Sequence, residues 1–156
     1  MIKINLICMG DIKEKYLRDA IAEYSKRISR FAELKIIELK EHVANSNNTL
    51  DIQKSLLKDA EEIKKHLKGH IFCLDINAKM YSSEEFSKKI EKCSLQNSEL
   101  TFIIGASNGI HNSIKEICNE KMSFSPMTFP HQLMRVIFLE QLYRAFTILN
   151  NIAYHK

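Results

Sequence analysis

The chain has 156 residues, of which 45% are hydrophobic and 27% are charged. This composition is typical of globular proteins and excludes a disordered chain, while only 4 glycines and 2 prolines exclude collagen-like and low-complexity proteins. The length favours one domain over residues 1–156, since a domain has roughly 150 residues. A net charge of +4, from 23 basic and 19 acidic residues, permits a polyanionic partner without requiring one.

Short apolar, β-branched runs alternate along the chain with apolar residues at helical spacing. In chain order these patterns predict a strand at 2–8, a helix at 13–30, a strand at 34–39, a helix at 50–67 with Thr49 as its N-cap, a strand at 70–75, a helix capped by Ser82 or Ser83, a strand at 100–104, a helix at 110–118, a strand at 121–124 and a long helix at 130–149 opened by Pro130. The alternation predicts an α/β fold: a mostly parallel sheet with helices on both faces.

The long helix that ends the chain is apolar almost all round. His131, Gln132 and Arg135 share one face near its start, and Glu140, Arg144 and Thr147 share the opposite face farther along. A helix of this kind must be covered on both sides. We expect the sheet to cover one side and a second copy of the chain to cover the other, which predicts a two-fold symmetric homodimer. The alternative is a helix buried wholly within one chain.

Compartment and metal content follow from the absence of several signals. No charge-free stretch approaches the roughly 20 apolar residues that a membrane span needs, and the N-terminus lacks a signal-peptide cleavage site. A cytoplasmic protein is therefore expected. The four cysteines, Cys8, Cys73, Cys93 and Cys118, form no CxxC pair and are expected to be reduced, small and buried. Without an HExxH motif or Cys/His pairs at ligand spacing, no metal is expected.

Two segments suggest a ligand site at the carboxyl edge of the sheet. The turn GASNG, residues 105–109, follows a strand at the edge where open α/β sheets bind ligands, although it is also compatible with an ordinary turn. It matches neither GxGxxG nor GxxxxGK[ST], so a nicotinamide or P-loop nucleotide is not supported. In SFSPMTFPHQLMR, residues 123–135, two prolines stiffen the connection. This loop either clamps a flat apolar ligand or is a rigid connector in which His131 only caps the helix.

The stretch SPMTFPHQLMRVIFLEQLYRAF, residues 125–146, and the terminal YHK closely resemble the ribosomal RNA large subunit methyltransferase H family of the SPOUT superfamily. The resemblance covers essentially the whole chain, including the strand end CLD and the turn FIIG. One departure is Ala106, where the family usually has a second glycine, and its methyl group can shift the turn or narrow the pocket.

The resemblance implies a deep trefoil knot near the C-terminus, an exception to the usual absence of knots. It also implies that the knot loops bind S-adenosylmethionine in a bent shape beside a dimer interface. Carried over by motif, the cofactor-binding residues are Leu74, Gly105, Phe124, Ser125, Pro126, Met127, Thr128 and Phe129.

The implied reaction is methylation of N3 of a pseudouridine in helix 69 of 23S ribosomal RNA on the assembled ribosome. We expect the incoming base to face a catalytic set made of His131, Arg135, Tyr154 and His155, with the tail reaching the cofactor of the partner. Arg135 would stabilise the N3 anion or hold phosphate, and His131 or His155 would take the proton. Two alternatives remain: a SPOUT methyltransferase acting on another RNA, such as tRNA, and a non-catalytic ribosome-binding module.

Overall fold

A computed structural model describes all residues, 1–156, as five strands and five helices in strict alternation. Their bounds are β1 (Ile2–Met9), α1 (Lys15–Ile28), β2 (Ala32–Leu39), α2 (Thr49–Lys64), β3 (His70–Leu74), α3 (Ser83–Gln96), β4 (Glu99–Ile104), α4 (Asn112–Ile117), β5 (Glu120–Met122) and α5 (His131–Leu149). The strands form one sheet in the order β2-β1-β4-β3-β5, and every pairing is parallel. The α/β prediction is confirmed, with a sheet that is wholly rather than mostly parallel.

Several element ends differ from the sequence prediction for local reasons. The N-cap of α2 is Asn48, not Thr49, because the Asn48 side chain accepts a hydrogen bond from the backbone N–H of Asp51 at 2.8 Å. Ser82, not Ser83, caps α3 through a capping box. Strand β5 ends at Met122, so Phe124 belongs to the loop that follows rather than to the sheet.

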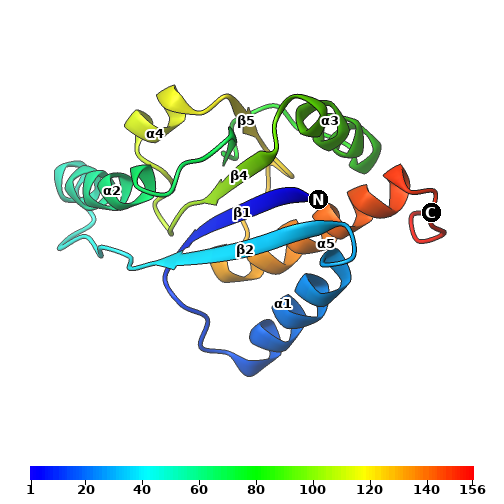
Figure 1. Ribbon diagram of the computed structural model, residues 1–156. Helices are drawn as coiled ribbons and strands as arrows, with labels where there is room; N and C mark the ends of the chain where they lie inside the picture. Colours follow the sequence, from blue (N-terminus) through cyan, green and yellow to red (C-terminus); the bar gives the residue numbers. More distant parts are fainter.

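Alternate residues of each strand face two separate cores, as the period of a strand requires. Ile4, Leu6 and Cys8 of β1 belong to the larger core, which α1, α3 and α5 cover. Ile7 and Met9 belong to the smaller core, which α2 and α4 cover. Figure 1 shows α1 and α5 together on one side of the sheet and α2 and α4 on the other.

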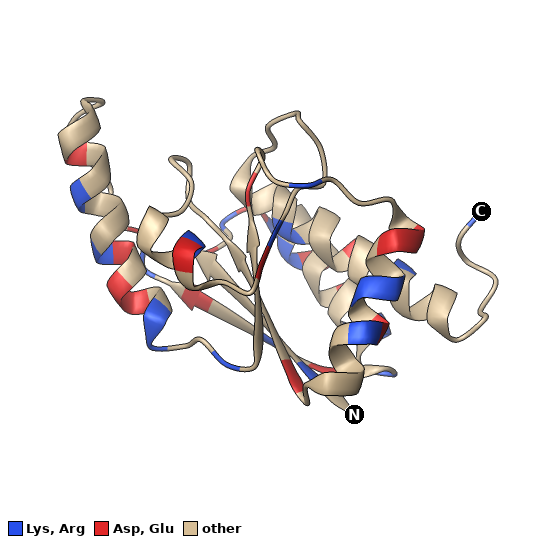
Figure 2. Cartoon of the chain, turned by 90° about the horizontal axis from the view of Figure 1, so that it is seen from above, with Lys and Arg blue, Asp and Glu red and all other residues tan.

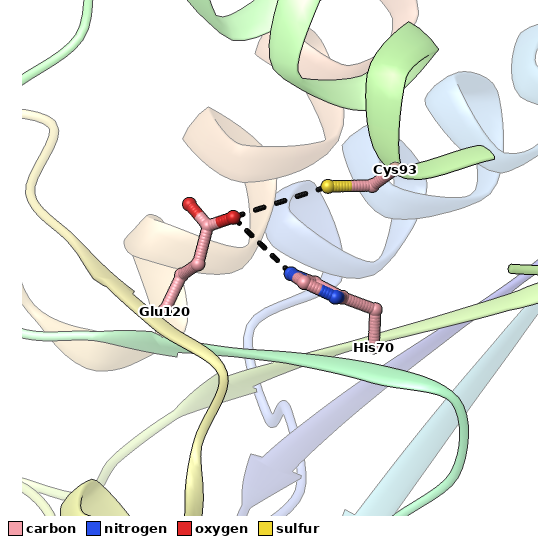
Figure 3. Close-up of side chains that lie close together, drawn as sticks. All are labelled: His70, Cys93 and Glu120. Carbon is pink, nitrogen blue, oxygen red and sulfur yellow. Dashed lines mark hydrogen bonds and ion pairs between the residues drawn. The ribbon is translucent and has the colours of Figure 1, made fainter. Parts of the chain in front are cut away.

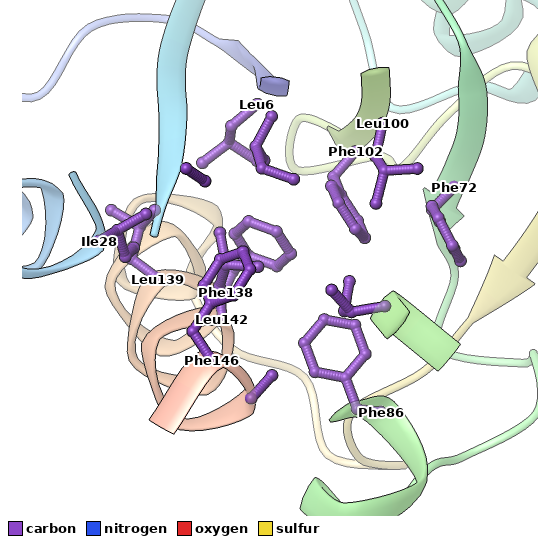
Figure 4. Close-up of a cluster of buried hydrophobic side chains, with 14 of the residues drawn as sticks. Leu6, Ile28, Phe72, Phe86, Leu100, Phe102, Phe138, Leu139, Leu142 and Phe146 are labelled. Atoms are coloured by element: carbon purple, nitrogen blue, oxygen red, sulfur yellow. The ribbon is translucent and has the colours of Figure 1, made fainter. Parts of the chain in front are cut away.

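Aromatic rings fill the larger core between the sheet and α5 (Figure 4). The Phe102 ring of β4 lies 4.6 Å from the ring of Phe72 and 4.8 Å from that of Phe138, measured between centroids. Phe138, Leu139 and Leu142 of α5 are fully buried. One side of α5 is therefore covered by the sheet, as predicted, and the helix also packs against α1 and α3.

Three of the four cysteines are buried and Cys118 is half-buried, and all four are free thiols. No helix combines the length and the apolarity that crossing a bilayer requires.

Gly69, in the turn between α2 and β3, offers a direct test of this packing. Its φ is +65°, and a Cβ there would lie 1.9 Å from the backbone oxygen of Glu99. Gly10 has a similar φ of +79°, but a Cβ there would meet nothing closer than 3.9 Å. In urea denaturation, Gly10→Ala is expected to lower the unfolding free energy by about 1–2 kcal/mol, from backbone strain alone. Gly69→Ala is expected to lower it by about 3 kcal/mol or more, and equal losses would contradict this packing.

Candidate functional site

A pocket of about 760 Å³ opens where the carboxyl ends of β3 and β4 meet the loop between β5 and α5. This is the edge at which parallel α/β sheets place their ligands. Of the eight residues expected to bind a cofactor, seven line the pocket: Leu74, Gly105, Phe124, Ser125, Met127, Thr128 and Phe129. Pro126 does not line it. The structure therefore brings the expected strand end, turn and loop together around one cavity.

The turn after β4 places bare backbone against the pocket. A Cβ on Gly105 would lie 2.6 Å from the carbonyl oxygen of Gly109 and 2.6 Å from the Ile110 side chain, so only glycine fits there. Ala106 has no positive φ, and its side chain packs into the smaller core. The departure from the family pattern at Ala106 is thus accommodated by the core, although the residue also borders the pocket.

The loop that closes the pocket is held by its own hydrogen bonds and by one aromatic anchor. The Ser123 hydroxyl donates to the carbonyl of Ser125 at 3.0 Å, and the N–H of Met127 donates to the Ser125 hydroxyl at 3.0 Å. The Phe124 ring lies 5.9 Å from that of Phe86 and 6.2 Å from that of Phe138. Phe124 thus ties the loop to the larger core, while Met127 stays 72% exposed.

His131 begins α5 and lines the pocket. The N-cap of the helix is Pro130, which makes no side-chain hydrogen bond, so His131 is the first helical residue rather than the cap. Its Nδ1 atom is buried and has no hydrogen-bond partner within the protein. A buried polar atom without a partner is costly, which favours a ligand or substrate group as its partner.

Arg135, one turn further along α5, is not in the pocket wall. Its side chain is 1% exposed and donates from Nη1 to the Glu38 carboxylate at 2.8 Å. Nη2 donates to the carbonyls of Met9 at 2.8 Å and Gly10 at 2.7 Å. The expectation that Arg135 faces an incoming base is corrected by this burial: the guanidinium joins α5 to the ends of β1 and β2.

The terminal residues are held in a hydrogen-bonded network on α3 and α5. The Tyr154 hydroxyl donates to Glu140 at 3.0 Å, and burial together with this carboxylate raises the pKa of Tyr154 to about 12. His155 is bonded to the Glu84 carboxylate at 2.7 Å, which lowers the pKa of Glu84, and it also accepts from Arg144 at 3.2 Å. The tail is therefore packed rather than frayed.

The structure does not bring the four expected catalytic residues together within one chain. Tyr154 is anchored at Glu140, which lies nine residues after His131 on α5, or about 14 Å along the helix axis. His131 lines the pocket, and Tyr154 and His155 are part of the tail network. Arg135 is buried and binds the ends of β1 and β2.

Two charged pocket residues lay outside the expected site. Lys115 of α4 forms an ion pair with Asp75 at 3.2 Å, and both line the pocket. Burial opposes ionisation of Asp75, but the N–H of Asn77 and the Lys115 ammonium together lower its pKa. Asp75 was recognisable as a strand end, whereas nothing in the sequence around Lys115 distinguishes it from other surface lysines of a helix.

A family profile described as "Predicted SPOUT methyltransferase" matches residues 2–155. The chain belongs to the SPOUT methyltransferase family. It is 49% identical, over 98% of its length and 99% of the relative's, to a protein of Fusobacterium nucleatum subsp. nucleatum named ribosomal RNA large subunit methyltransferase H. A protein of the same name from Clostridium botulinum is 48% identical over the same shares of the two chains.

Among solved structures, a probable methylase family protein from Haemophilus influenzae Rd KW20 has a similar fold. The TM-score is 0.54 at 13% sequence identity, covering 99% of this chain and 70% of the other. This likeness supports the methyltransferase fold alone, and the trefoil knot stays a prediction.

Replacing Arg135 tests whether it acts as a structural clamp. Arg135→Ala leaves the carbonyls of Met9 and Gly10 without a donor and is expected to lower the unfolding free energy by about 2–4 kcal/mol. Glu38→Ala leaves the buried guanidinium without its carboxylate partner but keeps both carbonyl acceptors, so it is expected to be destabilising to a smaller extent, by about 1–3 kcal/mol. Chemical denaturation of the two variants measures the difference, and an Arg135→Ala protein of wild-type stability would refute the clamp.

Proposed function

We propose that this SPOUT protein transfers a methyl group from S-adenosylmethionine to N3 of a pseudouridine in helix 69 of 23S ribosomal RNA, on the assembled ribosome. The observation that carries the proposal is the match over nearly the whole chain to relatives named ribosomal RNA large subunit methyltransferase H. The pocket supports it, because the residues that the family motif assigns to the cofactor converge there, Pro126 excepted.

The pocket fits S-adenosylmethionine in size and chemistry. A volume of about 760 Å³ is within the range of small-molecule sites, roughly 300–1,000 Å³. Leu74, Ile104 and Phe124 offer apolar surface for an adenine ring, and the bare backbone at Gly105 permits close approach. The bound cofactor would supply a methyl group already activated by its positively charged sulfur.

The protein's own task is then to align the base and remove its N3 proton. Good alignment alone can lower a barrier by about 7–11 kcal/mol. His131 lies at the pocket, and its Nδ1 has no hydrogen-bond partner within the protein, which leaves this ring nitrogen available to a group of the incoming base. Arg135 acts here as a positioning residue, since it fixes the helix turn that follows His131.

A homodimer would unite the two groups of site residues. A second hollow of about 290 Å³ adjoins the pocket and shares Phe124, Ser125 and Phe129 with it, while Ile137 of α5 forms part of its wall. Leu133 on α5 and Ile152 in the tail are 38% and 39% exposed, so both can contact a second copy of the chain. We propose that a second copy covers this face and that its tail, with Tyr154 and His155, completes the site.

The charge of the protein suits a composite ribosomal target better than free RNA. Figure 2 shows basic and acidic residues interspersed over the helices rather than gathered into one basic face. A charge of +4 per chain becomes about +8 in a dimer, enough for several phosphate contacts but small for a strong nucleic-acid binder. Contacts to the assembled ribosome would then have to supply the remaining affinity.

The decisive test is methyl transfer from labelled S-adenosylmethionine to assembled ribosomes that lack the modification, with mass-spectrometric mapping of the product. The expected result is label at N3 of the helix 69 pseudouridine, and little or none on naked 23S RNA. Cofactor binding without label on the ribosome would favour another RNA substrate. Failure to bind S-adenosylmethionine, with the protein folded, would favour a non-catalytic ribosome-binding module.

Removing the proposed proton acceptors should separate catalysis from binding. His131→Ala and His155→Ala are each expected to lower kcat by about 10²–10⁴-fold if the altered residue is the general base, with little change in cofactor affinity. His66→Ala, outside the pocket and the tail network, is the matched control. Single-turnover kinetics and cofactor titration measure the two effects, and unchanged kcat in both variants would remove these histidines from the mechanism.

A further inference from the structure

Three metal-ligating side chains converge at the end of β3 opposite the pocket. His70 starts β3, Glu120 starts β5 and Cys93 lies in the last turns of α3, so three different elements contribute (Figure 3). The His70 Nε2 atom is 3.2 Å from Glu120 Oε1, and the Cys93 sulfur is 3.9 Å from the same oxygen. All three donor atoms lie within 4.8 Å of one another.

From this geometry we propose that His70, Cys93 and Glu120 bind one zinc ion. Around a tetrahedral zinc ion, bond lengths of about 2.0–2.3 Å place the ligand atoms about 3.4–3.6 Å apart. The two hydrogen-bonded pairs already lie close to this spacing, and the widest pair has to close by about 1 Å. A thiolate, an imidazole and a carboxylate together suit zinc better than magnesium or calcium, and three protein ligands leave the fourth position to water.

The surroundings of the cluster are compatible with a bound cation. Cys93 is 4% exposed, and the His70 and Glu120 side chains are 20% and 22% exposed, so the site is sheltered yet open to an entering ion. Binding would exchange the Cys93 thiol proton for zinc, with the proton released to water. Zinc and the two anionic ligands, the Cys93 thiolate and the Glu120 carboxylate, are together neutral.

The Lys89 ammonium already occupies part of this cluster. It lies 3.0 Å from Glu120 Oε2 and 3.2 Å from Oε1, the oxygen that His70 and Cys93 also approach. A zinc ion bound to Oε1 would therefore have to displace the ammonium from that oxygen, and Lys89 would keep Oε2 as an outer partner that orients the carboxylate. The Lys89 side chain is 25% exposed and can move toward solvent if the ion displaces it.

A zinc ion here would anchor the edge of the sheet. Strand β5 has only three residues and pairs only with β3. Met122 and Ser123 immediately follow Glu120 and Lys121 and line the pocket, so a metal that ties Glu120 to α3 also fixes the start of the pocket loop. The role is structural rather than catalytic, because the cluster and the pocket lie at opposite ends of β3.

The test uses the full chain, reduced, stripped with a chelator and dialysed, then titrated with cobalt(II) and with zinc. The expected result is one metal ion per chain by elemental analysis, a thiolate-to-cobalt charge-transfer band and a zinc-dependent rise in Tm. Cys93→Ser is expected to abolish the band and to weaken zinc binding by more than about 100-fold, beyond the 10–100-fold typical of outer-sphere losses.

Glu120→Gln keeps the shape of the side chain, so it tests zinc binding even if the Cys93→Ser protein does not fold. It is expected to weaken zinc binding to a similar degree while circular dichroism stays that of the wild type. Cys118→Ser, which removes a half-buried thiol elsewhere, is the matched control and should bind zinc like the wild type. A wild-type protein that takes up no metal, or a folded Cys93→Ser protein that binds as the wild type does, would overturn the proposal.

Discussion

The rest of the structure depends on one buried guanidinium. Arg135 carries a positive charge at 1% exposure, which is tolerable only because Glu38 and two strand-end carbonyls surround it. Those carbonyls belong to Met9 and Gly10, at the carboxyl end of β1, which lies between β2 and β4. The contact holds α5 at the carboxyl edge of the sheet, and this sets the position of the helical turns on either side of Arg135. His131 then falls at the pocket one turn before, and Phe138 falls in the core one turn after.

Three regions lie in different parts of the fold, although the residues that form them alternate along the sequence. The carboxyl edge holds a pocket built from backbone and apolar side chains. The outer surface of α3 and α5 holds the tail network, in which Glu140 and Glu84 accept hydrogen bonds from the terminal residues. The amino end of β3 holds the polar cluster centred on Glu120. Helix α3 or α5 contributes at least one residue to each of these three regions. The two helices that pack on the larger core therefore connect regions that do not touch one another.

Local patterns were sufficient to predict the elements and much of the pocket. Strand periodicity placed the end of the strand at 70–75 and the turn at 105–109 at one edge of a parallel sheet, whereas Leu74 itself was named through the family resemblance. Arg135 was misjudged because it shares a helical face with His131, and only the fold reveals Glu38 and the strand-end carbonyls as its partners. His70, Cys93 and Glu120 are far apart in sequence, so no ligand spacing pointed to them. The reaction itself came from family resemblance, because no residue pattern specifies a pseudouridine.

The strand order has a consequence for how the chain acquires its structure. Strand β4 lies between β1 and β3, although it follows both in sequence, so the centre of the sheet cannot form until residues 99–104 are available. The larger core then stays open until Phe138, Leu142 and Phe146 of α5 arrive. Such non-local pairing slows folding, because the chain loses the entropy of closing long loops before the new contacts stabilise it. During synthesis, the nascent chain thus exposes the apolar faces of β1, β3 and β4 that line the larger core until residues 131–149 of α5 have emerged.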